Sequence, residues 1–112
     1  MKENDELLYR INVLEYHQKL LLKLLSDPNL DFYRLVIEYG LSEQEVRDFF
    51  QLCDNLTEKM EEQKAEGFVY FHPLFSEFSR FLPARMDVNE VMQSCLRQKL
   101  FEPLFTEINK CL

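Results

Sequence analysis

The side chains that could carry chemistry in this sequence are two histidines, three cysteines and a cluster of glutamates. The histidines and cysteines are His17, His72, Cys53, Cys95 and Cys111, and they share no spacing of one or two helical turns. A metal site needs ligands gathered at such spacings, so this set predicts no metal ion. His17 has no Ser or Cys beside it in the sequence to activate as a nucleophile, and His72 directly precedes a proline, where a capping or packing role is expected.

The glutamates and glycines indicate which other kinds of site are absent. Glu58, Glu61 and Glu62 are close enough in sequence to touch one cation, but carboxylates at a helix end usually form a solvated surface. Because Gly40 and Gly67 are the two glycines of the chain, the sequence contains neither of the glycine-rich phosphate-binding motifs, G-x-x-x-x-G-K and G-x-G-x-x-G. The nucleophile-elbow motif G-x-S-x-G is absent as well. We therefore expect no cofactor, no catalytic residue and no enzymatic activity.

The charge balance argues against nucleic acid as a partner. The chain has 13 basic and 20 acidic residues and a net charge of −7, and residues 43–66 carry five of those net charges. This acidic segment follows Gly40, where the sequence is similar to the turn of a DNA-binding helix-turn-helix. A recognition helix presents its first residues to phosphates and base edges, and here those residues include Glu43, Glu45 and Asp48. The favoured interpretation is a helical corner that does not contact DNA.

The sequence also indicates where the chain resides. Its first residues lack the basic region, apolar run and cleavage site of a secretory signal. Its most apolar run, residues 20–25, contains Lys23 and is far shorter than the roughly 20 residues needed to cross a bilayer. Three widely separated cysteines are more typical of reduced thiols, buried as small apolar side chains, than of a disulfide framework. We expect a cytoplasmic protein that does not enter a membrane.

The longest amphipathic segment is the first one, about residues 3–25. Its apolar side chains recur at a 4-3 spacing that only Gln18 interrupts, which predicts a helix with a coiled-coil-like stripe. We call this stripe the apolar seam, and its residues are Leu7, Ile11, Leu14, Leu21 and Leu25. Because four further leucines lie off the seam, we expect packing on both sides of the last turns; these are Leu8, Leu20, Leu22 and Leu24.

The rest of the chain divides into shorter helices with recognisable ends. Gly40 and Gly67 are expected just past helix ends, and Pro73 and Pro103 near helix starts. Ser42 with Glu45, and Asp87 with Glu90, have the spacing of capping pairs at helix starts. Residues 68–71 are expected to form an extended connector. The predicted inward faces are Val46, Phe49, Phe50, Cys53, Leu56 and Met60; Leu74, Phe75, Phe78, Phe81 and Leu82; Val91, Met92, Cys95 and Leu96; and Leu104, Phe105, Ile108 and Leu112.

Together these patterns predict an all-α protein in which residues 1–112 form a single domain of about five to six helices. It has a long N-terminal helix and a helix-turn-helix-like corner at Gly40. A chain of 112 residues has a limited interior, so helices this apolar are expected to complete their burial in another subunit. We therefore expect a homo-oligomer that self-associates through the apolar seam and also binds other proteins.

Aromatic side chains are dense in the second half of the chain and support the same expectation; they are Phe68, Tyr70, Phe71, Phe75, Phe78 and Phe81. The alternative function is a transcriptional regulator that binds DNA. It would use the turn at Gly40 and a basic patch assembled across subunits from Arg80, Arg85, Arg97 and Lys99.

Several short motifs in the chain resemble those of one protein family. They are Tyr39-Gly40-Leu41-Ser42, Cys53-Asp54-Asn55-Leu56-Thr57-Glu58, Gln63-Lys64-Ala65-Glu66-Gly67-Phe68-Val69 and Met86-Asp87-Val88-Asn89-Glu90. In this order and spacing the sequence is similar to the YhaI-like family of small bacterial proteins of unknown function, over nearly the whole chain. The resemblance implies a multihelical fold and residence in the cytoplasm of a Bacillus-type organism, and it supplies no functional residues. Family members carry a Gly near the position of Lys99, which implies a helix break there in the family; this sequence lacks that Gly, so the resemblance does not fix where its own fifth helix ends.

Overall fold

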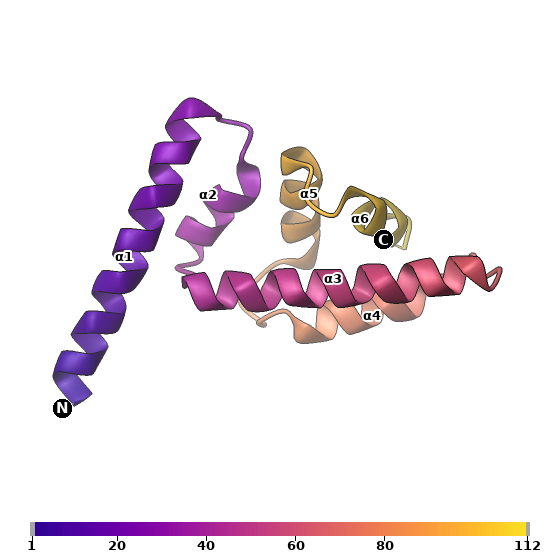
Figure 1. The fold of residues 1–112 in the computed structure, drawn as a ribbon, viewed down its shortest axis with the longest axis horizontal. Coiled ribbons are helices and arrows are strands. Elements are labelled where there is room, and N and C mark those ends of the chain that lie inside the picture. Colours follow the sequence, from indigo (N-terminus) through magenta and orange to yellow (C-terminus); the bar gives the residue numbers. More distant parts are fainter. Residues whose placement is uncertain (1, 112) are drawn as a thin grey trace.

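The structure, a computed structural model that describes residues 2–111, consists of six α-helices (Figure 1). No strand occurs among these described residues. The helices are α1 (Lys2–Ser26), α2 (Asp31–Glu38), α3 (Glu43–Ala65), α4 (His72–Phe81), α5 (Val88–Gln98) and α6 (Glu102–Asn109). The all-α fold expected from the sequence is confirmed, and residues 68–71 form the expected connector without helix or strand.

An aromatic cluster forms the centre of the molecule. The Phe32 ring of α2 stacks on Phe49 of α3 at 5.1 Å between centroids, and Phe49 meets the edge of Phe78 in α4 at 6.0 Å. Phe78 in turn makes an edge contact with Phe105 in α6 at 5.3 Å. Edge and offset arrangements of this kind are the favoured geometries of aromatic pairs. These contacts join α2, α3, α4 and α6, and the buried side chains Val91, Met92 and Cys95 of α5 belong to the same core. We call α2 to α6 the body.

Local capping residues define where α3 and α5 begin. The Ser42 hydroxyl accepts a hydrogen bond from the Glu45 backbone N–H at 3.1 Å, and the Glu45 carboxylate accepts one from the Ser42 N–H at 3.1 Å, so the predicted capping box is confirmed. Asp87 caps α5 through the Glu90 N–H. The reciprocal half is not formed there, because the Glu90 carboxylate accepts a hydrogen bond from the Tyr39 hydroxyl at 2.9 Å.

Three helices end on a residue in the left-handed conformation. Gly40 follows α2 with a φ of 69°, Gly67 follows α3 with a φ of 92°, and Lys99 follows α5 with a φ of 62°. At each end the next backbone N–H donates to the carbonyl five residues earlier, as in Leu100 to Cys95 at 2.9 Å. Both glycines are where the sequence predicts them, and the helix break implied at Lys99 is present without a glycine.

Replacing Lys99 by glycine is expected to stabilise the protein. The left-handed conformation costs a residue with a Cβ about 1–2 kcal/mol, and glycine avoids this cost while losing more chain entropy on folding. The net gain in the free energy of unfolding should be about 0.5–1 kcal/mol, measured from urea unfolding curves. The matched control is Lys110→Gly, because Lys110 follows α6 with a φ of −67° and should lose stability. Equal effects of the two substitutions would contradict this explanation.

One predicted inward residue is wrong. Phe81 was expected on the buried face of α4, but its side chain is 64% exposed, whereas Leu74 and Phe78 of the same helix are buried. Phe81 is the last residue of α4, and the chain leaves the helix there toward Pro83, so helical periodicity no longer sets its environment. Phe50, Phe75 and Leu96 are partly buried, and Leu112 lies outside the described residues.

Candidate functional site

Helix α1 is held against the body by the second half of its length. The His17 ring nitrogen Nε2 lies 2.7 Å from the Leu41 carbonyl oxygen, in the turn between α2 and α3, and both His17 and Leu20 are buried. Tyr16 beside them is half-buried, and burial together with the negative charge of Glu43 raises its pKa to about 12. The Lys23 ammonium lies over the Tyr33 ring at 5.5 Å from its centroid. His17 therefore serves as an anchor for α1.

The first half of α1 has no such support. Every side chain from Lys2 to Asn12 is exposed. Figure 1 shows this half of the helix extending beyond the body, with the N-terminal end far from α3. Since most helical stability in proteins comes from packing rather than from intrinsic propensity, an unsupported stretch of this length is stabilised poorly by its own chain.

The apolar seam is exposed along the whole of α1. Its exposed fractions are 56% at Leu7, 51% at Ile11, 65% at Leu14, 50% at Leu21 and 83% at Leu25. Leu8 and Leu22 flank it and are also more than half exposed. With about 3.6 residues per turn, the seam is centred roughly 120° around the helix from the face that carries His17 and Leu20. Within one chain, the last turns of α1 are thus covered from one side only.

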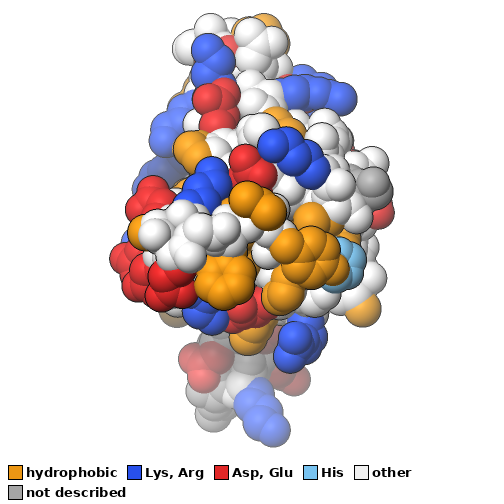
Figure 2. Space-filling view, turned by 90° about the vertical axis from the view of Figure 1, so that its right-hand side faces the viewer, with side chains coloured by type: hydrophobic (Ala, Val, Ile, Leu, Met, Phe, Trp, Pro, Cys, Tyr) orange, Lys and Arg blue, Asp and Glu red, His pale blue; other side chains and the backbone are white. Residues whose placement is uncertain are grey.

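A second, smaller apolar surface lies in the connector between α3 and α4. Phe68, Val69 and Tyr70 are each more than half exposed, while the following Phe71 is buried. Figure 2 looks onto this end of the molecule, where hydrophobic side chains gather in the middle among charged ones. The Tyr70 ring stacks on His72 at 5.9 Å, so the predicted packing role of His72 is local to this connector. Of the six aromatic residues expected at an interaction surface, Phe71 and Phe78 belong to the core instead.

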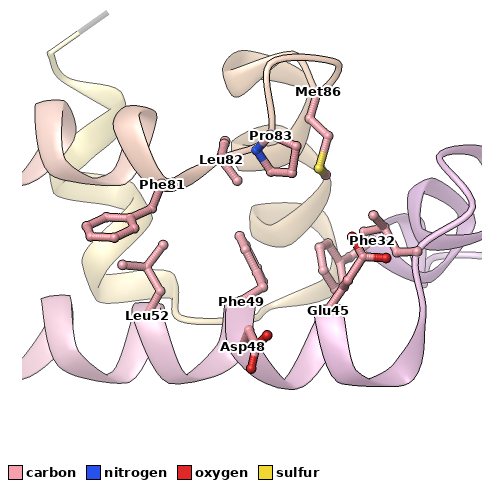
Figure 3. A pocket seen from close by; sticks show the side chains of 10 residues that line it. Phe32, Glu45, Asp48, Phe49, Leu52, Phe81, Leu82, Pro83 and Met86 are labelled. Atoms are coloured by element: carbon pink, nitrogen blue, oxygen red, sulfur yellow. The ribbon is translucent and has the colours of Figure 1, made fainter.

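A pocket of about 250 Å³ opens between α3 and the end of α4 (Figure 3). Its lining is mainly apolar; the residues are Phe32, Leu41, Phe49, Leu52, Phe81, Leu82, Pro83 and Met86, with Glu45 and Asp48 from α3. Both carboxylates already have partners, because Glu45 accepts from the Ser42 N–H and Asp48 accepts from the Gln44 side-chain amide at 2.8 Å. No paired nucleophile and base lines this pocket.

The helix-turn-helix-like corner does not offer a basic surface. Arg47, the basic residue in the first turns of α3, forms an ion pair with Glu43 of the same helix at 2.6 Å. Two members of the predicted basic patch are also paired with acids: Arg85 with Glu45 at 3.4 Å and Arg97 with Asp31 at 2.9 Å. A surface that binds DNA must present unneutralised Lys and Arg to phosphates. The ion pairs therefore favour a structural role for this corner.

No group of three His, Cys, Asp or Glu side chains that could hold a metal ion occurs in residues 2–111. The glutamates considered above, Glu58, Glu61 and Glu62, are all exposed on α3. Within the same residues, no helix is both long enough and apolar enough to cross a membrane.

The three cysteines are free thiols in different environments. Cys53 and Cys95 are fully buried, and Cys111 is partly exposed. Burial raises the pKa of the Cys95 thiol to about 12 and raises that of Cys53 as well. Because the thiolate is the reactive form, neither buried cysteine is suited to act as a nucleophile at neutral pH.

Alkylation of the native protein is expected to modify one cysteine of the three. With iodoacetamide near pH 8, Cys111 should react while Cys53 and Cys95 stay as buried thiols. Mass spectrometry of the intact protein should show one added group in the native state and three after unfolding in urea. The control is Cys111→Ser, which should take up no label when native. Rapid labelling of Cys53 or Cys95 in that variant would contradict the burial described here.

The sequence identified the exposed seam but not the anchor that orients it. Periodicity is visible within one helix, whereas the contact between His17 and Leu41 joins residues 24 positions apart. The same holds for the ion pairs of Arg85 with Glu45 and Arg97 with Asp31, which join two of the four residues of the predicted basic patch to acidic residues far away in the sequence.

Comparison with known families agrees with the resemblance to proteins of unknown function. A family model described as "Protein of unknown function (DUF1878)" matches residues 4–112, which include all of α2 to α6 and nearly all of α1. The match thus covers the seam, the anchor and the body together. The chain belongs to the DUF1878 family.

Proposed function

We propose that this chain is a non-enzymatic helical protein of the cytoplasm that self-associates through the apolar seam and acts by binding other proteins. The observation that carries the proposal is the exposure of large apolar side chains along one face of α1. These residues are Leu7, Leu8, Ile11, Leu14, Leu21, Leu22 and Leu25. Soluble monomers rarely expose apolar patches that extend over several turns, and such patches usually mark an interface.

Association would bury the apolar side chains of α1 that the single chain leaves exposed. Burying a leucine side chain contributes about 1.5–3 kcal/mol, and the exposed positions on α1 leave most of this contribution unused. A partner along the seam would also support the first half of α1, which has no packing of its own. The other surfaces support this choice, since the pocket carboxylates and the arginines of the corner already have partners.

Two further parts of the proposal are the cytoplasmic location and the relationship to YhaI-like proteins. The cysteines support the first, and the sequence motifs support the second. The free, buried state of Cys53 and Cys95 is compatible with a reducing compartment and supports the cytoplasm. The motifs from Tyr39 to Glu90 support a YhaI-like protein of a Bacillus-type organism within the wider family.

The proposal is tested by the mass of the protein in solution. One chain has a mass of 13.6 kDa. Sedimentation equilibrium across a hundredfold range of concentration should give a mass that rises to a multiple of this value. A mass of one chain at every concentration would reject self-association through the seam.

A further inference from the structure

We infer that the partner of α1 is α1 of a second copy of this chain, packed parallel and in register as a coiled coil. This inference rests on the self-association proposed above and adds the partner, the orientation and the contacts. Three observations support it: the heptad positions of the seam residues, the charges beside the seam, and the side of α1 on which the body packs.

The seam residues occupy both core positions of a heptad repeat. Leu7, Leu14 and Leu21 fall at position d, and Ile11, Gln18 and Leu25 fall at position a. In a parallel pair each residue meets its own copy, so the two Gln18 side chains meet and can hydrogen-bond to each other. In the antiparallel register that matches Leu7 with Leu25, position a faces position d, and Gln18 lies against Leu14. Only the parallel pair gives the Gln18 amide a polar partner.

The charges that flank the seam favour the same orientation. Arg10 is at position g and Glu15 at position e, and in parallel coiled coils a g residue reaches the e residue five positions later in the other helix. Two Arg10–Glu15 ion pairs therefore form by symmetry. An antiparallel pair places Glu15 opposite Glu15, which is repulsive. Both side chains are exposed, and neither takes part in an ion pair within residues 2–111.

The body leaves room for this arrangement. The face of α1 that packs on its own chain lies roughly 120° from the seam, as estimated from the helical repeat. In a parallel pair with a two-fold axis along the helices, the two bodies point away from each other on opposite sides. The first half of α1 extends beyond the body of its own chain (Figure 1), and in the parallel pair it lies beside the first half of α1 of the other copy.

Disulfide cross-linking tests the orientation directly. Leu25 is 83% exposed, so Leu25→Cys in a Cys111→Ser background should fold normally. In the parallel pair the two introduced thiols adjoin, within the 4.4–6.8 Å between Cα atoms that a disulfide spans. Oxidation should then give a covalent dimer on a non-reducing gel, while Cys111→Ser alone should give none.

The other outcomes of this experiment separate the inference from the proposed function. In the antiparallel register the two Leu25 positions would lie about 27 Å apart. A covalent dimer would then form only when Leu7→Cys and Leu25→Cys proteins are mixed, which would overturn the orientation while leaving self-association intact. An unmodified protein with the mass of one chain at every concentration would overturn both.

A charge substitution provides a second test, in which the two orientations predict opposite signs. Glu15→Gln removes both ion pairs of the parallel assembly and should raise the dissociation constant about two- to thirtyfold. In an antiparallel assembly the same change removes a repulsion and should lower it. Lys19→Gln is the matched control, because Lys19 is four residues from Glu15 on the same helix but points away from the seam. An unchanged or lower constant for Glu15→Gln overturns the inference.

Discussion

Replacing Leu14 and Leu21 by aspartate is expected to convert the protein to monomers. Both side chains lie in the middle of the apolar seam and are at least half exposed in the single chain, so the fold does not depend on them. In the assembly each would bury a carboxylate against apolar side chains, in addition to losing about 2 kcal/mol of apolar burial per leucine. Four leucines change in a pair of chains, and the dissociation constant should rise by a factor of a thousand or more.

Sedimentation equilibrium and circular dichroism together check this result. The variant should sediment as one chain of 13.6 kDa and keep a helical spectrum and a cooperative thermal transition. The matched control is Phe68→Asp with Val69→Asp, which makes the same number of apolar-to-acid changes on the exposed connector between α3 and α4. That variant should keep the mass of the unmodified protein. If the seam variant kept that mass with its fold intact, the interface would lie elsewhere.

The ends of the helices could be predicted from the sequence because they are local. The capping box at Ser42 and Glu45 and the left-handed glycines at Gly40 and Gly67 involve residues within one turn of each other. Their types and spacing are therefore sufficient to indicate them. Phe81 shows the limit of this approach, because it is the last residue of α4 and its exposure depends on the path of the next loop.

The candidate site likewise has one part that the sequence predicts and one part that it does not. The seam is a property of one helix and is visible as a 4-3 repeat. The face that α1 turns toward the body is set by His17 and Leu20, whose partners lie in other segments of the chain. On α1 the sequence shows more apolar side chains than the seam requires, and only the fold distinguishes Leu20, which is buried, from Leu21, which is exposed. The apolar side chains beyond those of the seam indicate that α1 has two packing surfaces.

Replacing Phe78 by alanine is expected to lower the free energy of unfolding by about 3–5 kcal/mol. The Phe78 ring is fully buried and lies between Phe49 of α3 and Phe105 of α6, so it joins three helices of the body. Its removal leaves a cavity that these helices cannot close without breaking their other contacts. A domain of this length is stabilised by about 6–17 kcal/mol in total, so the change should move the urea midpoint clearly.

Phe81→Ala is the matched control, since it removes the same ring from the last turn of the same helix at an exposed position. Its effect should stay below about 1 kcal/mol, and equal effects of the two substitutions would contradict the placement of Phe78 and Phe81. Neither ring belongs to α1. In the absence of denaturant, Phe78→Ala should therefore keep the mass of the unmodified protein while it unfolds at a lower urea concentration. Leu14→Asp with Leu21→Asp should instead reduce the mass to one chain while the body stays folded. The two variants together therefore separate the stability of the body from assembly through α1.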